Sequence, residues 1–314
     1  MDWAEHIWLV RLGAGIGHAV SLPALAAVGL LVGYFAGMFG VGGGFLLTPV
    51  LIYVFGVPPP VAVGSALCQK CGTSISSFLK YRRLGRGEPC IDLVMLGGSL
   101  IGVDAGTRLL TYLTGLGDWH VGHGHGVPAV QVVLDGLFIV LLSFTAFYTF
   151  RDAWQARLRS VPRGDTTIPG PLVTKVRIPP FIDLPSVQLR QVSVPMLSYL
   201  GFGLGMASGV MGIGGGVLFM PILLYGIGLS VRNAAGTGVL LLFVTVAMGT
   251  VEQSLHGYVS LKLALAILIG SSVGAQLGAL TTYYLPNRVL RLLFAVLVAA
   301  TVIMIGWDLL RLLR

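Results

Sequence analysis

The sequence predicts an all-α membrane protein that crosses the bilayer several times and is built from two repeats. Apolar residues make up 55% of the 314 residues and charged residues only 10%, whereas a soluble domain has about 25% charged residues. Four stretches contain no Asp, Glu, Lys or Arg, at 12–69, 191–231, 233–251 and 263–287. Since a spanning helix needs roughly 20 apolar residues, several spans follow from these stretches.

A duplication within the chain is the basis for the two repeats. Residues 40–44 read Gly-Val-Gly-Gly-Gly and residues 212–216 read Gly-Ile-Gly-Gly-Gly, at an offset of 172 residues. At this offset, 13 of the 35 positions from 33 to 67 are identical. Two halves with matching apolar segments interrupted by glycine are typical of secondary transporters with a central binding site.

Each half divides into five apolar segments, at 23–40, 45–56, 61–79, 91–112 and 128–150, and at 195–212, 217–228, 233–250, 261–283 and 288–310. The second segment of each half is too short to span. A helix that ends in the glycine motif and restarts near Thr48 and Pro49 predicts a broken or re-entrant hairpin, with Thr48 as the N-cap. Such irregular backbone at membrane depth must be buried in protein or line a wet cavity.

The fourth segment of each half carries a stripe of glycines, at Gly98, Gly102 and Gly106 and at Gly270, Gly274 and Gly278. Small residues at this spacing let two helices approach closely, so the stripe predicts helix packing.

Four regions follow along the chain: an N-terminal helix within 1–22, spanning or interfacial; a first transmembrane repeat at 23–151; a connector at 152–194; and a second repeat at 195–314. The acidic start with Asp2 and Glu5 does not indicate a removable signal peptide. The connector is rich in proline and basic residues, and we expect it in the cytoplasm.

The net charge of +8 reflects membrane topology rather than nucleic-acid binding, because the basic residues cluster in connectors beside apolar segments. The connector after 61–79 carries four basic residues whose offset partners are uncharged or acidic, and the connector before 288–310 shows the reverse. Positive charge at opposite ends of equivalent segments predicts two repeats of inverted topology.

At these motifs the chain resembles the TauE/SafE family of membrane transporters. The residues that carry the resemblance are Gly40–Pro49 with Ala62, Gly64 and Ser65, and Gly212–Pro221 with Asn233, Ala234, Gly236 and Thr237. The resemblance covers both halves. It implies a multi-pass transporter of the cytoplasmic (inner) membrane, not an enzyme, that moves sulfite, sulfonates or related small anions with proton or ion coupling and without a cofactor.

Lys70 is the leading candidate for binding such an anion. It lies in the middle of an apolar segment, where an ammonium costs several kcal/mol unless it is paired or hydrated. Its offset partner is Leu242, so the repeat does not require a charge there. The alternatives are a lysine that snorkels to the interface, or one paired with Asp104 or Asp135.

Backbone amides and neutral side chains complete the predicted anion site. The glycine motifs expose amides near electropositive helix N-termini, although glycines at these positions could equally serve tight packing. Ser65, Gln69, Asn233 and Thr237 would orient the anion, or would form hydrogen bonds between helices instead. The amide candidates are Gly42, Gly43, Gly44, Gly214, Gly215 and Gly216.

Cys68 and Cys71 flank Lys70, and a nearby cation favours thiolate. Three interpretations stay open: small apolar residues that pack in the helix, contact with reduced sulfur such as thiosulfate or sulfide, and a membrane-bound thiol oxidoreductase.

Asp104 and Asp135 are the candidates for coupling to protons, unless they are counter-ions of Lys70. His120, His123 and His125 lie in a glycine-rich connector, where a metal site or a metal-ion transporter is the alternative to a solvated loop. Because a structural zinc site usually has four ligands, we favour the loop and expect no bound metal. The expected partners are a small anion, the lipid bilayer and a coupling ion, but not nucleic acid; homo-oligomer formation is left open.

Overall fold

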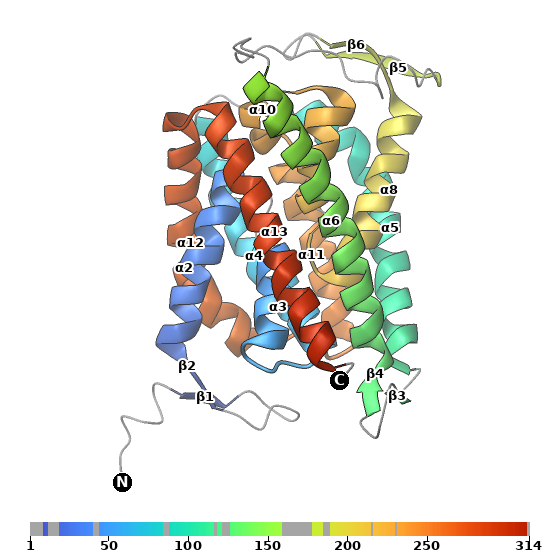
Figure 1. Ribbon diagram of the computed structural model, residues 1–314. Helices are drawn as coiled ribbons and strands as arrows, with labels where there is room; N and C mark the ends of the chain where they lie inside the picture. The colour runs from blue at the N-terminus through green and yellow to red at the C-terminus, as the bar shows by residue number, and fades with distance from the viewer. Residues whose placement is uncertain are drawn as a thin grey trace.

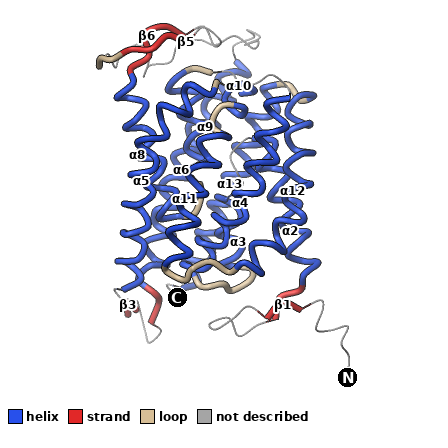
Figure 2. The backbone as a smooth tube through the Cα atoms, turned by 180° about the vertical axis from the view of Figure 1, so that it is seen from behind, coloured by secondary structure: helices blue, strands red, loops and turns tan. Residues whose placement is uncertain are grey.

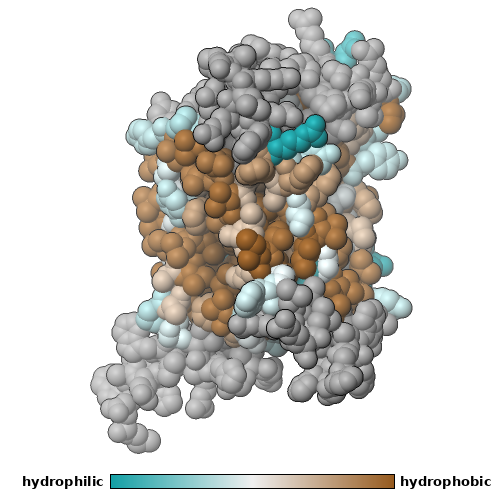
Figure 3. Space-filling view, in the orientation of Figure 1, coloured by the Kyte–Doolittle hydropathy of each residue, from teal (hydrophilic) through white to brown (hydrophobic). Residues whose placement is uncertain are grey.

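Figure 1 shows the computed structural model as a bundle of long helices with short strand pairs at its two ends. The structure describes residues 9–11, 19–39, 44–83, 88–115, 118–120, 126–158, 178–184, 189–214, 216–229 and 231–312. Within these residues, five helices are long and apolar enough to cross a membrane. Hydrophobic residues form a belt around the middle of the face seen in Figure 3, with more polar residues towards both ends. The predicted all-α polytopic membrane fold is confirmed.

The helices follow the predicted segments with few exceptions. Those of the first half are α2 (Leu22–Phe39), α3 (Gly44–Tyr53), α4 (Pro59–Arg83), α5 (Pro89–Gly115) and α6 (Ala129–Leu158). Those of the second half are α8 (Val194–Met211), α9 (Gly216–Pro221), the π-helix η2 (Ile222–Ile227), α10 (Val231–Gly236), α11 (Val239–Leu255), α12 (Leu261–Tyr284) and α13 (Asn287–Leu312).

Among the described residues, three antiparallel strand pairs lie outside the helix bundle. They are β1 (Leu9–Arg11) with β2 (Ala19–Ser21), β3 (Asp118–His120) with β4 (Gly126–Pro128), and β5 (Phe181–Leu184) with β6 (Leu189–Ser193). A helix was expected within residues 1–22. The described residues of that region instead form the strands β1 and β2. Residues 1–8 and 12–18 lie outside the described residues.

The two halves are intertwined through their glycine stripes. α2 packs against α12 on one side of the bundle, and α5 packs against α8 on the other (Figures 1 and 2). A Cβ atom at Gly102 would collide with the backbone of α8 at Phe202, and one at Gly274 would collide with the backbone of α2 at Leu30. The predicted close approach is confirmed, and each stripe meets the first helix of the opposite half.

Equivalent helices of the two halves run in opposite directions. α2 begins at the end of the bundle that carries β1 to β4, whereas α8 begins at the end that carries β5 and β6 (Figure 1). α6 and α13 likewise start from opposite ends. The orientation of each half relative to the two faces of the bilayer stays a prediction.

Each half contains a helix that stops inside the bundle and restarts as a short helix. α8 ends at Met211, its C-cap residue Gly212 has a left-handed backbone with φ of 66°, and Gly214 follows with φ of 67°. Glycine adopts this conformation without a steric penalty, which explains the motif in the second half. In the first half, Thr48 is wrong as the predicted N-cap, because α3 already begins at Gly44 and continues through Pro49.

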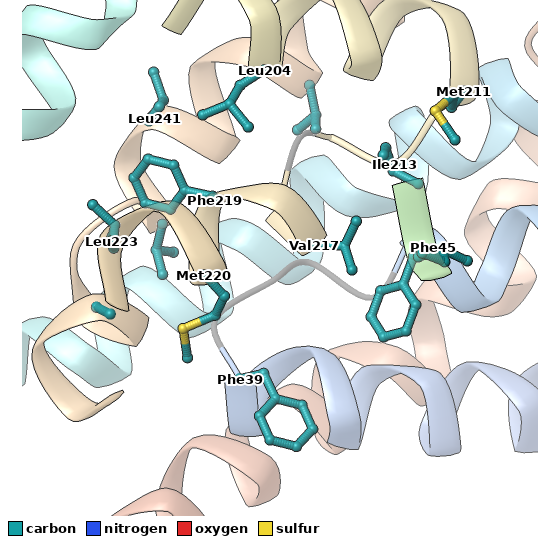
Figure 4. Packing of buried hydrophobic residues seen from close by; sticks show 14 of the residues in the cluster. Phe39, Phe45, Leu204, Met211, Ile213, Val217, Phe219, Met220, Leu223 and Leu241 are labelled. Atoms are coloured by element: carbon teal, nitrogen blue, oxygen red, sulfur yellow. The ribbon is translucent and has the colours of Figure 1, made fainter. Parts of the chain in front are cut away.

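Apolar side chains fill the space where the two interrupted segments meet. Figure 4 shows Phe39 and Phe45 from the first half near Ile213, Val217 and Met220 from the second. All five are buried members of one hydrophobic cluster. The centre of the bundle is therefore closed by packed side chains in this structure.

The third segment differs between the halves. α4 is one continuous helix of 25 residues, whereas its partner is divided into α10 and α11 by Thr237 and Gly238. Gly238 has φ of 91°, and a Cβ atom there would collide with the ring of Phe219. The sequence pattern predicts one uninterrupted segment at 233–250, so this break differs from the prediction.

Candidate functional site

Lys70 lies near the middle of α4 and is fully buried, with 0% of its surface exposed. Its ammonium group donates a hydrogen bond to the backbone carbonyl of Gly212, the C-cap residue of α8. Unpaired carbonyls give a helix C-terminus a partial negative charge, so this contact is electrostatically favourable. A cation is thereby held against the helix break of the other half.

The alternatives that the sequence left for Lys70 are wrong. A buried lysine in the middle of a helix does not snorkel to the interface. Asp104 pairs instead with Arg108 at 3.0 Å on the surface, and the buried Asp135 accepts a hydrogen bond from the hydroxyl of Tyr53. Within the described ranges, no carboxylate forms an ion pair with Lys70.

A small cavity lies beside the lysine. It has a volume of about 10 Å³ and is lined by Leu204, Gly214, Phe219, Leu241, Leu242 and Thr245. A Cβ atom on Gly214 would lie 3.5 Å from Cδ of Lys70 and 3.4 Å from the side chain of Leu242. Lys70 and Leu242, which occupy equivalent positions in the two repeats, therefore both lie beside this glycine. The cavity has room for roughly one water molecule, so it is too small for a polyatomic anion in this state.

The neutral candidates hold helices together in this state. Ser65 Oγ accepts a hydrogen bond of 3.0 Å from the backbone N–H of Ser260. Gln69 donates through Nε2 to Ser271, while its buried Oε1 has no partner in the described structure. Thr237 Oγ1 accepts from the backbone N–H of Glu88 at 2.8 Å.

Asn233 is half-buried in α10, one turn before Thr237. Of the neutral candidates, Gln69 is adjacent to Lys70 in α4, whereas Asn233 lies in α10 and Thr237 lies between α10 and α11. The interhelical role that was weighed against anion binding is the one observed for Ser65, Gln69 and Thr237. Their contact with a substrate stays a prediction.

Cys68 and Cys71 are free and half-buried on α4. The Cys71 sulfur lies 3.5 Å from Thr250 Oγ1 on α11, a contact between the two central helices. Contact of these thiols with reduced sulfur and a redox role both stay predictions.

The glycine amides are only partly described. Gly42, Gly43 and Gly215 lie outside the described residues, while Gly44 and Gly216 are the first residues of α3 and α9. Anion binding by these amides stays a prediction.

Two residues that hold the interrupted helices were not predicted from the sequence. The Tyr81 hydroxyl donates to the Gly37 carbonyl near the end of α2 at 2.8 Å, and Gln253 Nε2 donates to the Gly209 carbonyl near the end of α8 at 3.2 Å. Both donor and acceptor pairs are related by the repeat offset of 172 residues. Comparing polar positions across the repeat, rather than only identical ones, would have found them.

Asp92 was also missed. It is buried in the first turn of α5, and its carboxylate interacts with the backbone amides of Gly238 and Leu241 at the start of α11. Gly238 has no side chain to cap this helix, so Asp92 supplies the negative group that a helix N-terminus favours.

The described residues contain no group of three or more His, Cys, Asp or Glu side chains that could hold a metal ion. His120 lies in β3, whereas His123 and His125 fall outside the described residues. The metal alternative for this connector stays untested.

The chain matches known proteins over most of its length. The family model described as "Sulfite exporter TauE/SafE" matches residues 25–305. The "Probable membrane transporter protein YunE" of Bacillus subtilis (strain 168) is 26% identical over 274 residues, covering 83% of this chain and 88% of that protein. A "Probable membrane transporter protein" of Xylella fastidiosa (strain 9a5c) is 24% identical over 294 residues, covering 91% and 95%. No solved structure matches the chain significantly.

Proposed function

Because the chain belongs to the TauE/SafE family of membrane transporters, we propose that it is a secondary transporter of small sulfur-containing anions such as sulfite and sulfonates. The name of the family model supports this substrate class. The relatives are named as probable membrane transporters without a substrate. We place the protein in the cytoplasmic membrane, with its basic connector on the cytoplasmic side.

The observation that carries the proposal is the full burial of Lys70, which forms no ion pair with a carboxylate of the described residues. A charged side chain at the centre of a membrane protein is costly and commonly marks a substrate pathway. The Gly212 carbonyl holds the ammonium in the closed state. An entering anion would offer a full negative charge in place of this dipole, and charge-assisted hydrogen bonds of that kind are the stronger ones.

The arrangement of the halves supports alternating access. Equivalent helices run in opposite directions (Figure 1), and both interrupted helices end inside the bundle, where apolar side chains close the centre (Figure 4). Inverted repeats with broken helices at a central site are the general design of several secondary transporters. We propose that the two intertwined helix pairs rock against each other to expose Lys70 to each side in turn.

Uptake of radiolabelled sulfite, thiosulfate and sulfoacetate into proteoliposomes tests this function. Wild-type protein is compared with Lys70→Met, which removes the charge and keeps a similar apolar stem, and with Lys80→Met as a matched control. Lys80 lies near the end of the same helix and is partly exposed. We expect saturable uptake of at least one anion by the wild type and the control, and loss of that uptake in Lys70→Met.

Two results would contradict the proposal. Absence of uptake of all three anions by wild-type protein would reject the substrate class. Equal uptake by wild type and Lys70→Met would reject Lys70 as the anion-binding residue while leaving the transporter function standing.

A further inference from the structure

Hydrogen bonds divide six helices of the bundle into two groups of three. The first group contains α2, α4 and α12, and the second group contains α8, α11 and α5. At the repeat offset of 172 residues, α2 corresponds to α8, α12 corresponds to α5, and most of α4 corresponds to α11. The two groups are therefore equivalent units, and each takes helices from both halves of the chain.

In the first group, α4 is bonded to both of its neighbours. Near one end of α4, Ser65 Oγ accepts a hydrogen bond of 3.0 Å from the N–H of Ser260, the N-cap residue of α12. Near the middle, Gln69 donates to a side chain of α12. Near the other end, the Tyr81 hydroxyl donates to the Gly37 carbonyl of α2 at 2.8 Å. α4 is thus held along its length by helices of its own group.

The second group repeats this plan around α11. Just before α11, Thr237 Oγ1 accepts from the N–H of Glu88, which precedes α5, at 2.8 Å. In the middle, the hydroxyl oxygens of Ser99 on α5 and Thr245 on α11 lie 3.1 Å apart. Near its end, Gln253 donates to a carbonyl of α8 at 3.2 Å. The contacts at both ends are the repeat partners of those in the first group, so the grouping is a property of the repeat.

Backbones also touch inside each group. A Cβ atom on Gly33 of α2 would lie 2.5 Å from Cα of Ser271 on α12, and one on Gly205 of α8 would lie 2.8 Å from Cα of Ser99 on α5. Small residues permit this close approach. Two helices in such contact cannot slide past each other without first separating, so each group resists internal motion.

Apolar and weak contacts connect one group with the other. α4 of the first group packs against α11 of the second, and a Cβ atom on Gly249 would lie 3.1 Å from the side chain of Leu67. The Cys71 sulfur lies 3.5 Å from Thr250 Oγ1, and a thiol is a weak hydrogen-bonding group. Apolar packing is not directional, and packed helices can shear past each other by small steps. Motion between the groups is therefore easier than motion inside them.

Lys70 adds a charged contact across this boundary. It lies in α4 of the first group, and its ammonium donates to the carbonyl of Gly212, the C-cap residue of α8 in the second group. Hydrogen bonds with a charged donor are roughly twice as strong as neutral ones. In the proposed function an anion replaces this carbonyl as the partner of the ammonium, which would remove the contact.

We propose that the two groups move as rigid bodies, that the anion path opens between α4 and the facing helices α8 and α11, and that the bond from Lys70 to Gly212 is the latch that an anion releases. This inference rests on the proposed transport function. It adds α4 and α11 to the two helix pairs and places the path at the boundary between the groups.

Two engineered disulfides test which helices move. Thr250→Cys places a thiol opposite Cys71 and joins α11 to α4 across the boundary. Ser99→Cys with Thr245→Cys is the matched control, which joins α5 to α11 inside the second group. The remaining native cysteines are replaced by serine, so that each variant has a single pair. Short side chains in direct contact suit disulfide geometry.

Uptake of radiolabelled sulfoacetate into proteoliposomes is measured for each variant in its oxidised and reduced forms. Sulfoacetate is the probe because sulfite and thiosulfate attack disulfides. We expect the disulfide across the boundary to abolish uptake and dithiothreitol to restore it. The disulfide inside the second group should leave uptake at the level of its reduced form. Loss of uptake in both oxidised variants, or in neither, would overturn the inference.

Distances between nitroxide labels decide the question where the disulfide variants do not fold or where the wild type transports only sulfite or thiosulfate. Labels replace Tyr112 on α5 and Leu261 on α12 across the groups, and Tyr112 and Leu255 on α11 within the second group; all three residues are exposed. A transported anion should shift the distance across the groups by more than about 2 Å and leave the other unchanged. Equal shifts in both pairs, or a shift in neither, would overturn the inference.

The same labels test the latch. Lys70→Met should broaden the distance distribution across the groups without any anion, whereas Lys80→Met should not; a distribution identical to that of the wild type would overturn the latch. Failure of the wild type to take up sulfite, thiosulfate and sulfoacetate rejects the transport function itself. Uptake by the wild type that a disulfide across the boundary does not affect rejects only this inference.

Discussion

Replacing Lys70 by methionine separates a binding role from a structural one. Methionine keeps the apolar stem beside Gly214 but removes the ammonium that contacts Gly212. If the lysine is present for an anion, the folded state should tolerate its loss. If it is present to cap α8, the folded state should not.

The expected change in stability is small because two contributions oppose each other. The hydrogen bond from a charged donor contributes about 1.5–3 kcal/mol, while a lysine at the centre of a membrane helix costs about 2.5–3.5 kcal/mol. We therefore expect Lys70→Met to change the free energy of unfolding by no more than about 2 kcal/mol. Leu67→Ala truncates a fully buried neighbour on α4 and should cost about 2–5 kcal/mol.

Anion binding should respond much more strongly. Loss of one charge-assisted contact weakens binding by about 10- to 100-fold. At about 100 times its Kd, an anion stabilises the wild type by about 2.7 kcal/mol. The same concentration should stabilise Lys70→Met by only about 0.4–1.4 kcal/mol.

Thermal unfolding in detergent, with and without thiosulfate or sulfoacetate, measures both quantities. The reasoning is refuted if Lys70→Met melts as low as Leu67→Ala while the anion raises the melting temperature of the variant as much as that of the wild type. That result would make Lys70 a helix cap.

Three further predictions concern packing, the interrupted helices and the thiols. Gly102→Leu should cost about 1–3 kcal/mol by forcing α5 away from α8, whereas Gly97→Leu on the same helix, with nothing within 4 Å of an added Cβ, should leave the melting temperature nearly unchanged. Tyr81→Phe removes the hydroxyl that holds the end of α2 and should lower the free energy of unfolding by about 1–2 kcal/mol, measured by chemical or thermal unfolding. The double variant Cys68→Ser, Cys71→Ser should retain sulfoacetate uptake; selective loss of thiosulfate uptake would instead favour direct contact between sulfur and these thiols.

Several features followed from local sequence patterns. Apolar stretches identify spanning helices because the thickness of the bilayer sets their length, and five helices of sufficient length are present. The glycine stripes predicted close helix packing, because only small residues let backbones touch. Lys70 stood out because a charge in an apolar segment is costly wherever the segment lies.

The partners of these features required the tertiary structure. The stripe of α5 meets α8 of the other half, and the lysine meets a carbonyl 142 residues away in sequence. The break at Gly238 also depends on the ring of Phe219, which lies in another helix. None of these contacts can be predicted from a local sequence pattern.

The sequence by itself determined the membrane class, the duplication and the presence of a lysine in the middle of an apolar segment, since each depends on residue type and spacing. The tertiary structure alone decided that Asp104 lies in a surface ion pair, that Asp135 meets Tyr53, and that Glu252 has a shielded carboxylate. The physical reason is that burial and pairing arise from the packing of segments distant in sequence. A carboxylate has the same local signature whether it ends in water or inside the bundle.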